Sequence, residues 1–163
     1  MQNNTITIVP LISNYIPHVV AMHYDFKKNY ELHHEAFYYK TDEYVNTTLT
    51  NFLTTNITNQ NFNCLIAKNE TDQVVGYIFG FIHSRAPIYH IQKYGWLSNL
   101  YVTLNYRHLG IAKALYNKLE VWFNYKAVSF IEVNHHVNDN YVAEVYQKLG
   151  FKNITTTMVK RLN

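Results

Sequence analysis

Apolar residues recur along the chain with two spacings, one typical of strands and the other of helices. Alternation of apolar and polar residues over 5–11 predicts a strand that ends near Pro10. Two apolar stretches, 61–68 and 74–84, flank a polar turn, which is the pattern of a β-hairpin. We predict further strands at 94–102, 128–136 and 151–162.

Spacings of three and four residues predict helices between these strands. They cover 13–37, 41–56, 110–125 and 140–150. An antiparallel hairpin combined with crossover helices indicates a mixed α/β (α+β) fold with helices on both faces of a mixed sheet. We therefore expect a single domain over 1–163, built on a twisted central sheet of six to seven strands.

The composition narrows the classes of protein. With 48% apolar and 15% charged residues, the chain is typical of globular proteins. Its net charge of +3 comes from scattered lysines rather than a basic cluster, so a nucleic-acid binder is not favoured. No apolar run has the length of about 20 residues that crosses a membrane, and no secretion signal opens the chain, so we expect a cytoplasmic protein. Cys64 cannot form an internal disulfide because it is the only cysteine, and we expect it to be a small buried hydrophobic residue.

The junction between the strand at 94–102 and the helix at 110–125 carries candidate chemistry. The first turn of a helix exposes N–H groups and a partial positive charge, which suit a phosphate. Gly110 permits a positive φ or a close approach of the main chain, Ala112 is small, and Arg107 adds a fixed charge. One glycine is a weak signal, so an ordinary strand-to-helix turn explains the loop equally well.

Two motifs together resemble the GNAT superfamily, the GCN5-related N-acetyltransferases. Residues 107–112 (RHLGIA) are similar to the family's pyrophosphate loop, Arg/Gln-x-x-Gly-x-Gly/Ala, and 143–151 (AEVYQKLGF) resemble its helix ending in Tyr-x-x-x-Gly-Phe. The resemblance spans about residues 5–160 and is strongest over 97–151. It implies the GNAT fold, in which acetyl-CoA lies in a wedge between two parallel strands that splay apart, here 95–102 and 128–136.

The resemblance also implies the residues that bind acetyl-CoA. The main chain of Leu100, Tyr101 and Val102 would meet the thioester and the pantetheine arm, because unpaired backbone groups of a splayed strand can bind a ligand. The pyrophosphate would lie on Arg107, His108, Leu109, Gly110, Ile111, Ala112 and Lys113. The family's CoA-contacting asparagine has Asp139 in its place here, so Asn140 and then Asn138 are the nearest candidates, although this polar run also fits a helix N-cap.

Two residues are candidates for proton transfer by the same resemblance. Tyr146 lies where the family places a tyrosine that protonates the leaving thiolate, and Glu132 matches a glutamate that some members use as the general base. Each has a structural alternative. Tyr146 could be a core tyrosine in a chain with 15 of them, and Glu132 could be a strand carboxylate in an ion pair.

The acceptor would bind near 30–44, a stretch rich in tyrosine, histidine and acid. We name His34, Glu35 and Tyr38 as acceptor-site candidates, since acids there would attract a cationic amine. The paired histidines at 33–34 and 135–136 do not indicate a metal, because adjacent strand residues point to opposite faces and no ligand set has metal spacing.

The predicted function is N-acetyl transfer from acetyl-CoA to a primary amine, on a small molecule or a peptide or protein, by direct attack in a ternary complex. The alternative is a non-catalytic acyl-CoA-binding sensor or regulatory module of the same fold. The family habit of exchanging or pairing final strands further implies a possible homodimer. Neither nucleic acid nor membrane is an expected partner.

Overall fold

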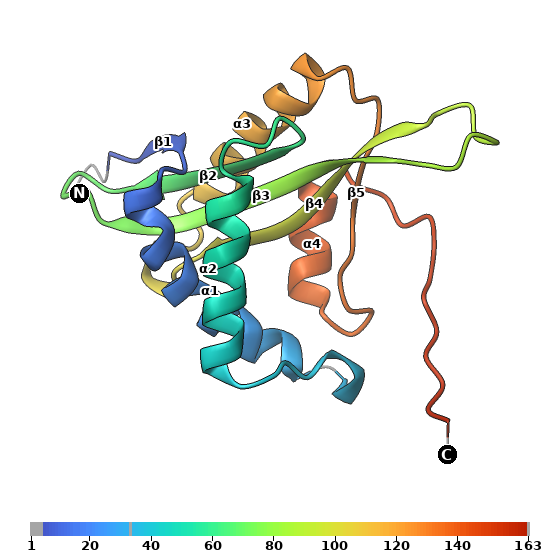
Figure 1. Cartoon of the computed structure of the whole chain (residues 1–163), viewed down its shortest axis with the longest axis horizontal. Coiled ribbons are helices and arrows are strands. Elements are labelled where there is room, and N and C mark those ends of the chain that lie inside the picture. Colours follow the sequence, from blue (N-terminus) through green and yellow to red (C-terminus); the bar gives the residue numbers. More distant parts are fainter. Residues whose placement is uncertain (1–4, 33, 163) are drawn as a thin grey trace.

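The computed structural model describes residues 5–32 and 34–162 and contains a five-stranded mixed sheet (Figure 1). The strands follow one another across the sheet in chain order, and all neighbours are antiparallel except the last pair, which is parallel. They are β1 (Thr7–Pro10), β2 (Phe62–Lys68), β3 (Val74–Ser84), β4 (Lys93–Val102) and β5 (Ile131–Val133). The hairpin predicted from the turn at 69–73 is confirmed as β2 and β3.

Helices cover both faces of the sheet, as predicted. They are α1 (Ile16–Glu31), α2 (Asp42–Asn56), α3 (Ile111–Tyr125) and α4 (Asn140–Lys148), with short 3-10 turns η1 (Ser13–Tyr15), η2 (Glu35–Phe37) and η3 (Leu104–Tyr106). Figure 1 shows α1 and α2 together on one side and α3 on the other. Within the described residues, none of these helices is long and apolar enough to cross a membrane.

Each face of the sheet carries its own hydrophobic cluster. Toward α1 and α2, the buried residues include Val19, Leu53 and Ile66, and Cys64 is buried in the same cluster. Toward α3, the cluster includes Leu115 and Leu119 together with residues of α4. A stripe of apolar residues on α3 thus packs against the sheet as its spacing predicted.

The pairing of β4 with β5 is short, and it produces the predicted splayed strands. β4 pairs with β5 only from Gly95 to Leu97, whereas it pairs with β3 as far as Val102. A register shift at Ser98 marks a bulge in β4 where the two parallel strands part. Among the described residues, the edge of β4 from 98 to 102 therefore has no strand on its β5 side.

The predicted number of strands was wrong, because the described residues form five strands rather than six to seven. No strand forms over 151–162, where the chain runs in an extended path away from the sheet (Figure 1). Its apolar residues Ile154 and Met158 are 79% and 92% exposed. A strand needs a partner edge as well as a suitable pattern, and β5 offers only three residues.

Candidate functional site at the open edge of β4

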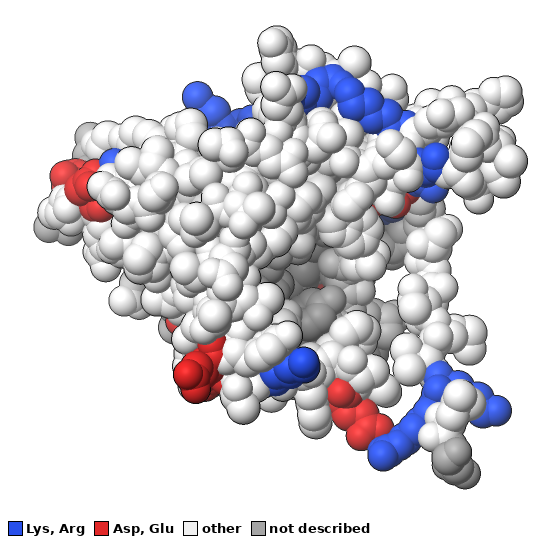
Figure 2. All heavy atoms as spheres, viewed as in Figure 1, with Lys and Arg blue, Asp and Glu red and all other residues white. Residues whose placement is uncertain are grey.

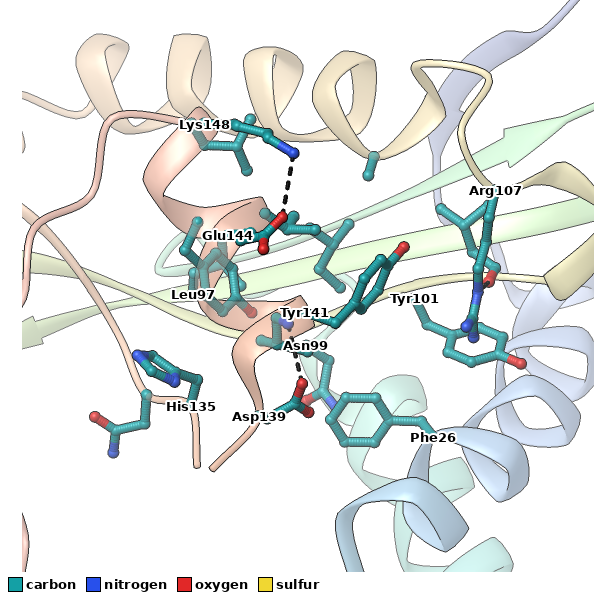
Figure 3. A pocket seen from close by; sticks show the side chains of 18 of the residues that line it. Phe26, Leu97, Asn99, Tyr101, Arg107, His135, Asp139, Tyr141, Glu144 and Lys148 are labelled. Carbon is teal, nitrogen blue, oxygen red and sulfur yellow. Dashed lines mark hydrogen bonds and ion pairs between the residues drawn. The ribbon is translucent and has the colours of Figure 1, made fainter. Parts of the chain in front are cut away.

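The open edge of β4 forms one wall of a cavity of about 1080 Å³. The loop before α3 and the start of α3 line one flank, and α4 with the loop before it lines another (Figure 3). Phe26, Leu32 and Tyr39 contribute from the α1 side. Segments that are distant in the sequence thus meet where β4 and β5 separate.

The first turn of α3 faces this cavity without a side-chain cap. Gly110 is the N-cap residue, with φ of 78° and ψ of 0°, and no side chain caps the helix. The positive φ explains the glycine, because a residue with a Cβ rarely adopts this conformation. His108 also has a positive φ, of 63°. A Cβ built on Gly110 would have nothing within 4 Å, so the main chain here is open to a ligand.

Arg107 is held against the open strand. Its Nε donates a hydrogen bond to the carbonyl oxygen of Val102 at 3.0 Å, and its guanidinium lies 5.6 Å from the centre of the Tyr101 ring. Lys113 and Lys148 line the same cavity. Three cations therefore line the cavity, two of them beside the start of α3, and this arrangement favours a ligand with several negative charges.

The main-chain residues expected at a thioester all lie at this wall. Leu100, Tyr101 and Val102 line the cavity on the part of β4 that β5 does not cover. The Tyr101 hydroxyl donates to Asp25 Oδ2 at 3.3 Å, and burial followed by the nearby Asp25 charge raises the pKa of Tyr101 above its usual value. The backbone edge and its side chains are thus fixed in place around the cavity.

Tyr146 lies at the cavity and is also part of the core. Its side chain projects from α4, is buried, and lines the cavity beside His135, whose ring centre is 6.5 Å away. Its ring also packs on Phe151 with centres 5.7 Å apart. Tyr146 is therefore both a core residue and a residue of the cavity wall, so its position is compatible with a structural role and with proton transfer.

The loop before α4 distinguishes the two asparagine candidates. Asn138 lines the cavity, whereas Asn140 is not among its lining residues. Asp139 caps α4, because its Oδ1 accepts a hydrogen bond from the Val142 amide at 3.0 Å. Figure 3 shows Tyr141 of α4 projecting toward the flank that carries Tyr101 and Arg107.

Glu132 lies away from the cavity lining and is paired with Arg85. The two side chains form an ion pair, with Arg85 at the loop end of the long β3–β4 hairpin. Since Glu132 lies in β5 opposite Trp96, it is close to the point where β4 and β5 begin to part. The structure does not bring its carboxylate together with Tyr146 at the cavity wall.

The three acceptor-site candidates lie outside the main cavity. His34 caps η2 by accepting a hydrogen bond from the Ala36 amide, and Glu35 accepts hydrogen bonds from Arg161 at 3.0 and 3.2 Å. Tyr38 is exposed and lines a second, shallower hollow. The adjacent Tyr39 lines both hollows.

Several lining residues were missed by the sequence analysis. These are Phe26, Leu32, Tyr39, Trp96, Asn99, Asn134 and His136. Asn99 had a signal in the sequence, since it follows Ser98 as a polar residue inside an otherwise apolar strand. Among the described residues, no group of three or more histidine, cysteine, aspartate or glutamate side chains is placed to hold a metal ion.

A family model described as "Acetyltransferase (GNAT) family" matches residues 25–151. The fold is similar to that of a tetramutant of the BH1408 protein from Bacillus halodurans, with 15% identity, a TM-score of 0.84, and coverage of 96% of this chain and 99% of that chain. It is also similar to the aminoglycoside antibiotic 6'-N-acetyltransferase AAC(6')-Ih from Acinetobacter baumannii, with 18% identity, a TM-score of 0.74, and coverage of 98% and 99%. A ribosomal-protein-alanine N-acetyltransferase from Brucella melitensis has 17% identity and a TM-score of 0.67, with 97% of this chain and all of that chain covered. No match was found among curated protein sequences.

Proposed function

Because the chain belongs to the GNAT acetyltransferase family, we propose that it transfers an acetyl group from acetyl-CoA to a primary amine by direct attack in a ternary complex. One observation carries this proposal: the unpaired edge of β4 lies beside the uncapped, glycine-led start of α3 in a single cavity. A long ligand with an anionic end and an amide-containing arm matches both parts of that cavity.

The anionic end of acetyl-CoA suits the start of α3. We assign its pyrophosphate to the amides of His108 through Ala112, together with the side chains of Arg107 and Lys113. The open space at Gly110 supports this assignment, since a phosphate oxygen can approach the main chain closely there. Asn138 is the asparagine that we assign to the CoA arm, because it lines the cavity and Asn140 does not.

The acetyl group belongs at the open edge of β4. The main chain of Leu100, Tyr101 and Val102 offers N–H and C=O groups that no strand pairs on that side. A backbone N–H that binds the thioester oxygen gains strength as that oxygen becomes negative during attack, so it stabilises the transition state more than the ground state.

Two proton transfers accompany the reaction. The amine loses a proton as it attacks, and the leaving thiolate gains one. We assign the second transfer to Tyr146, whose phenol lies at the cavity wall on α4. Glu132 would have to give up its ion pair with Arg85 to act as the base, so we assign the first transfer to water in the cavity.

The test combines binding with turnover. Isothermal titration of the purified chain with acetyl-CoA should show saturable binding, and release of free thiol should follow the addition of primary amines. Tyr146→Phe should lower kcat by about 10- to 100-fold, because it removes a general acid, while acetyl-CoA affinity is retained. Tyr125→Phe is the matched control, since Tyr125 is exposed at the far end of α3.

Each outcome has a distinct meaning. Absence of acetyl-CoA binding would refute the proposal. Binding without turnover on any amine would favour the non-catalytic sensor instead. Equal turnover by Tyr146→Phe and the wild type would remove Tyr146 from the mechanism but leave the enzyme assignment in place.

A further inference from the structure

Asn99 is a buried polar residue that the proposed chemistry does not use. It lies in β4 directly after the bulge, is 7% exposed, and lines the cavity. Its strand partner is Phe79, a member of the cluster that packs against α1 and α2. Asn99 therefore faces the side of the sheet opposite α3, away from Lys113 at the start of that helix. Burying a carboxamide is costly unless its polar atoms are satisfied, so its partners define its role.

Two neighbouring side chains fix the orientation of this carboxamide. Ser98 Oγ donates a hydrogen bond to Asn99 Oδ1 at 2.9 Å. Burial raises the pKa of Tyr77 well above its usual value, and a hydrogen bond from Asn99 partly counteracts that effect. The Tyr77 hydroxyl in turn lies 3.2 Å from His23 Nδ1. A carboxamide has two donor hydrogens and two acceptor sites. Within the part of the chain that the structure describes, these contacts use one of each, so one donor and one acceptor site remain for a ligand.

The walls around Asn99 are apolar and aromatic. The lining residues on this side include Phe26, Leu32, Tyr39, Trp96 and Tyr101. Figure 3 shows Phe26 and Asn99 on the side of the cavity where α1 lies, across from Glu144 and Lys148. A flat, apolar group attached to an amine would bury its surface here, whereas a polar one would lose hydration without replacement.

The four carboxylates nearest in the sequence to Phe26, Leu32 and Tyr39 each have a hydrogen-bond partner. Glu31 accepts a hydrogen bond from the Tyr39 amide at 2.8 Å, and Asp42 accepts one from Lys27 at 2.6 Å. Asp25 and Glu35 are bound by Tyr101 and Arg161, as described above. None of the four lines the cavity.

Two carboxylates do line the cavity, and both are engaged on α4. Asp139 caps the helix, and Glu144 lies 3.5 Å from the ammonium of Lys148. The cavity also holds three cations, so an acceptor with several positive charges gains little there. On the face of the molecule drawn in Figure 2, uncharged surface predominates and charged groups lie mostly at the margins.

We propose that Asn99 determines acceptor specificity, and that the preferred acceptors are primary amines attached to apolar or aromatic groups rather than polyamines or aminoglycosides. This inference rests on the proposed function. The Asn99 carboxamide holds the attacking amine through its remaining acceptor site while the aromatic walls bury the attached group. A neutral carboxamide does not stabilise an ammonium as a carboxylate would, so the bound amine loses its proton more readily and keeps the lone pair that attacks.

The experiment compares kcat/KM for four acceptors: phenethylamine, tryptamine, spermidine and kanamycin. In the wild type, the two arylalkylamines should exceed the two polycations by about tenfold or more, which corresponds to the loss of one well-placed contact. Asn99→Asp should shift this ratio toward the polycations by about tenfold, chiefly through KM for the amine, because it adds a negative charge at the acceptor. The dissociation constant of acetyl-CoA should stay within about twofold, since Asn99 faces away from α3.

Asn153→Asp is the matched control, because Asn153 is exposed and lies outside the cavity lining. Tyr77→Phe is a second probe, for the case in which Asn99→Asp does not fold. It frees the Asn99 carboxamide to rotate and should raise KM for tryptamine several-fold, with the acetyl-CoA dissociation constant unchanged.

Two results would overturn the inference: a wild type that prefers spermidine or kanamycin, or a folded Asn99→Asp variant whose acceptor ratio changes less than about twofold. If Asn99→Asp does not fold, an unchanged KM for tryptamine in Tyr77→Phe overturns it instead. These results can be distinguished from a failure of the proposed acetyl transfer. Turnover of any amine sustains acetyl transfer, whereas only the ratio between acceptors tests Asn99. If no amine is turned over, both proposals fail.

Discussion

His23 should make the stability of the protein depend on pH in the mildly acidic range. The side chain lies in α1, is 8% exposed, and is 3.2 Å from the Tyr77 hydroxyl through its Nδ1. Burial first, and the positive charge of Lys27 second, lower the pKa of His23 from 6.5 to about 4. The rings of Phe26 and Tyr39 also pack against it, so no carboxylate among these neighbours favours the charged form.

The size of the effect follows from the two pKa values. The unfolded chain binds a proton at His23 near pH 6.5, whereas the folded chain does so only near pH 4, so protons favour unfolding between these values. The free energy of unfolding should therefore fall as the pH falls. The loss from this residue is about 2 kcal/mol at pH 5 and about 3 kcal/mol at pH 4, and it levels off below the folded pKa. That is a large share of the roughly 5–15 kcal/mol that stabilises a typical domain.

The measurement is urea unfolding at several pH values between 7.5 and 4, followed by tryptophan fluorescence. His23→Asn is the informative variant, because its Oδ1 can still accept a hydrogen bond from Tyr77 but does not titrate. His90→Asn is the control, since His90 is exposed in the loop between β3 and β4. Other groups also titrate in this range, so the relevant quantity is the difference between each variant and the wild type.

The stability of His23→Asn should decline less steeply than that of the wild type below pH 6.5, so that the gap between the two free energies of unfolding changes by about 2 kcal/mol by pH 5 and about 3 kcal/mol by pH 4. His90→Asn should follow the wild type. Parallel curves for the wild type and His23→Asn between pH 7 and pH 4 would refute the reasoning. They would mean that the buried imidazole gains no protons on unfolding.

Three further predictions concern the cavity and the core. Arg107→Ala should raise the dissociation constant of acetyl-CoA by about 10- to 100-fold in calorimetry, because a charge-assisted contact is lost, whereas Arg161→Ala should leave it unchanged. Gly110→Ala should cost about 1 kcal/mol in urea unfolding, because a Cβ is strained at a φ of 78°, and should weaken acetyl-CoA binding; unchanged binding would contradict the assigned role of this turn. Gly95→Ala should destabilise the fold by about 1–3 kcal/mol, since its Cβ would lie 2.7 Å from the Phe123 ring, and an unchanged melting temperature would show that the ring moves aside.

Local patterns allowed most of the fold and the glycine-led turn before α3 to be predicted. The turn at Gly110 could be recognised because its conformational requirement and the amphipathic stripe of α3 are both encoded within a few residues. The splayed strands followed only from the resemblance to a family, because the point at which β4 and β5 part depends on a bulge at Ser98. At 151–162 the local pattern predicted a strand that does not form, because a suitable pattern does not supply a strand to pair with.

The aromatic flank of the cavity was harder to predict because its residues depend on long-range contacts. Arg85 and Glu132 are 47 positions apart and meet only because a long hairpin brings Arg85 back over β5. Tyr39, rather than Tyr38, reaches the cavity because the Tyr39 amide is tied to Glu31. Spacing along the chain does not encode such contacts, so the sequence analysis pointed to 30–44 but did not single out Tyr39 as a lining residue of the cavity.

The bulge at Ser98 explains how one strand can face both flanks of the cavity. In a regular strand, residues three apart point to opposite faces. Here the extra residue places Leu97 and Leu100 both toward α3, and Trp96 and Asn99 both toward α1 and α2. The main chain between them turns its unpaired edge to the cavity. The strand thus presents an apolar surface toward the cation-lined flank, a carboxamide toward the aromatic flank, and backbone groups between the two. Removal of the bulge would turn Asn99 away from the aromatic flank and extend the pairing with β5 across the cavity, so the acyl-donor binding and the acceptor choice that we propose should be lost together.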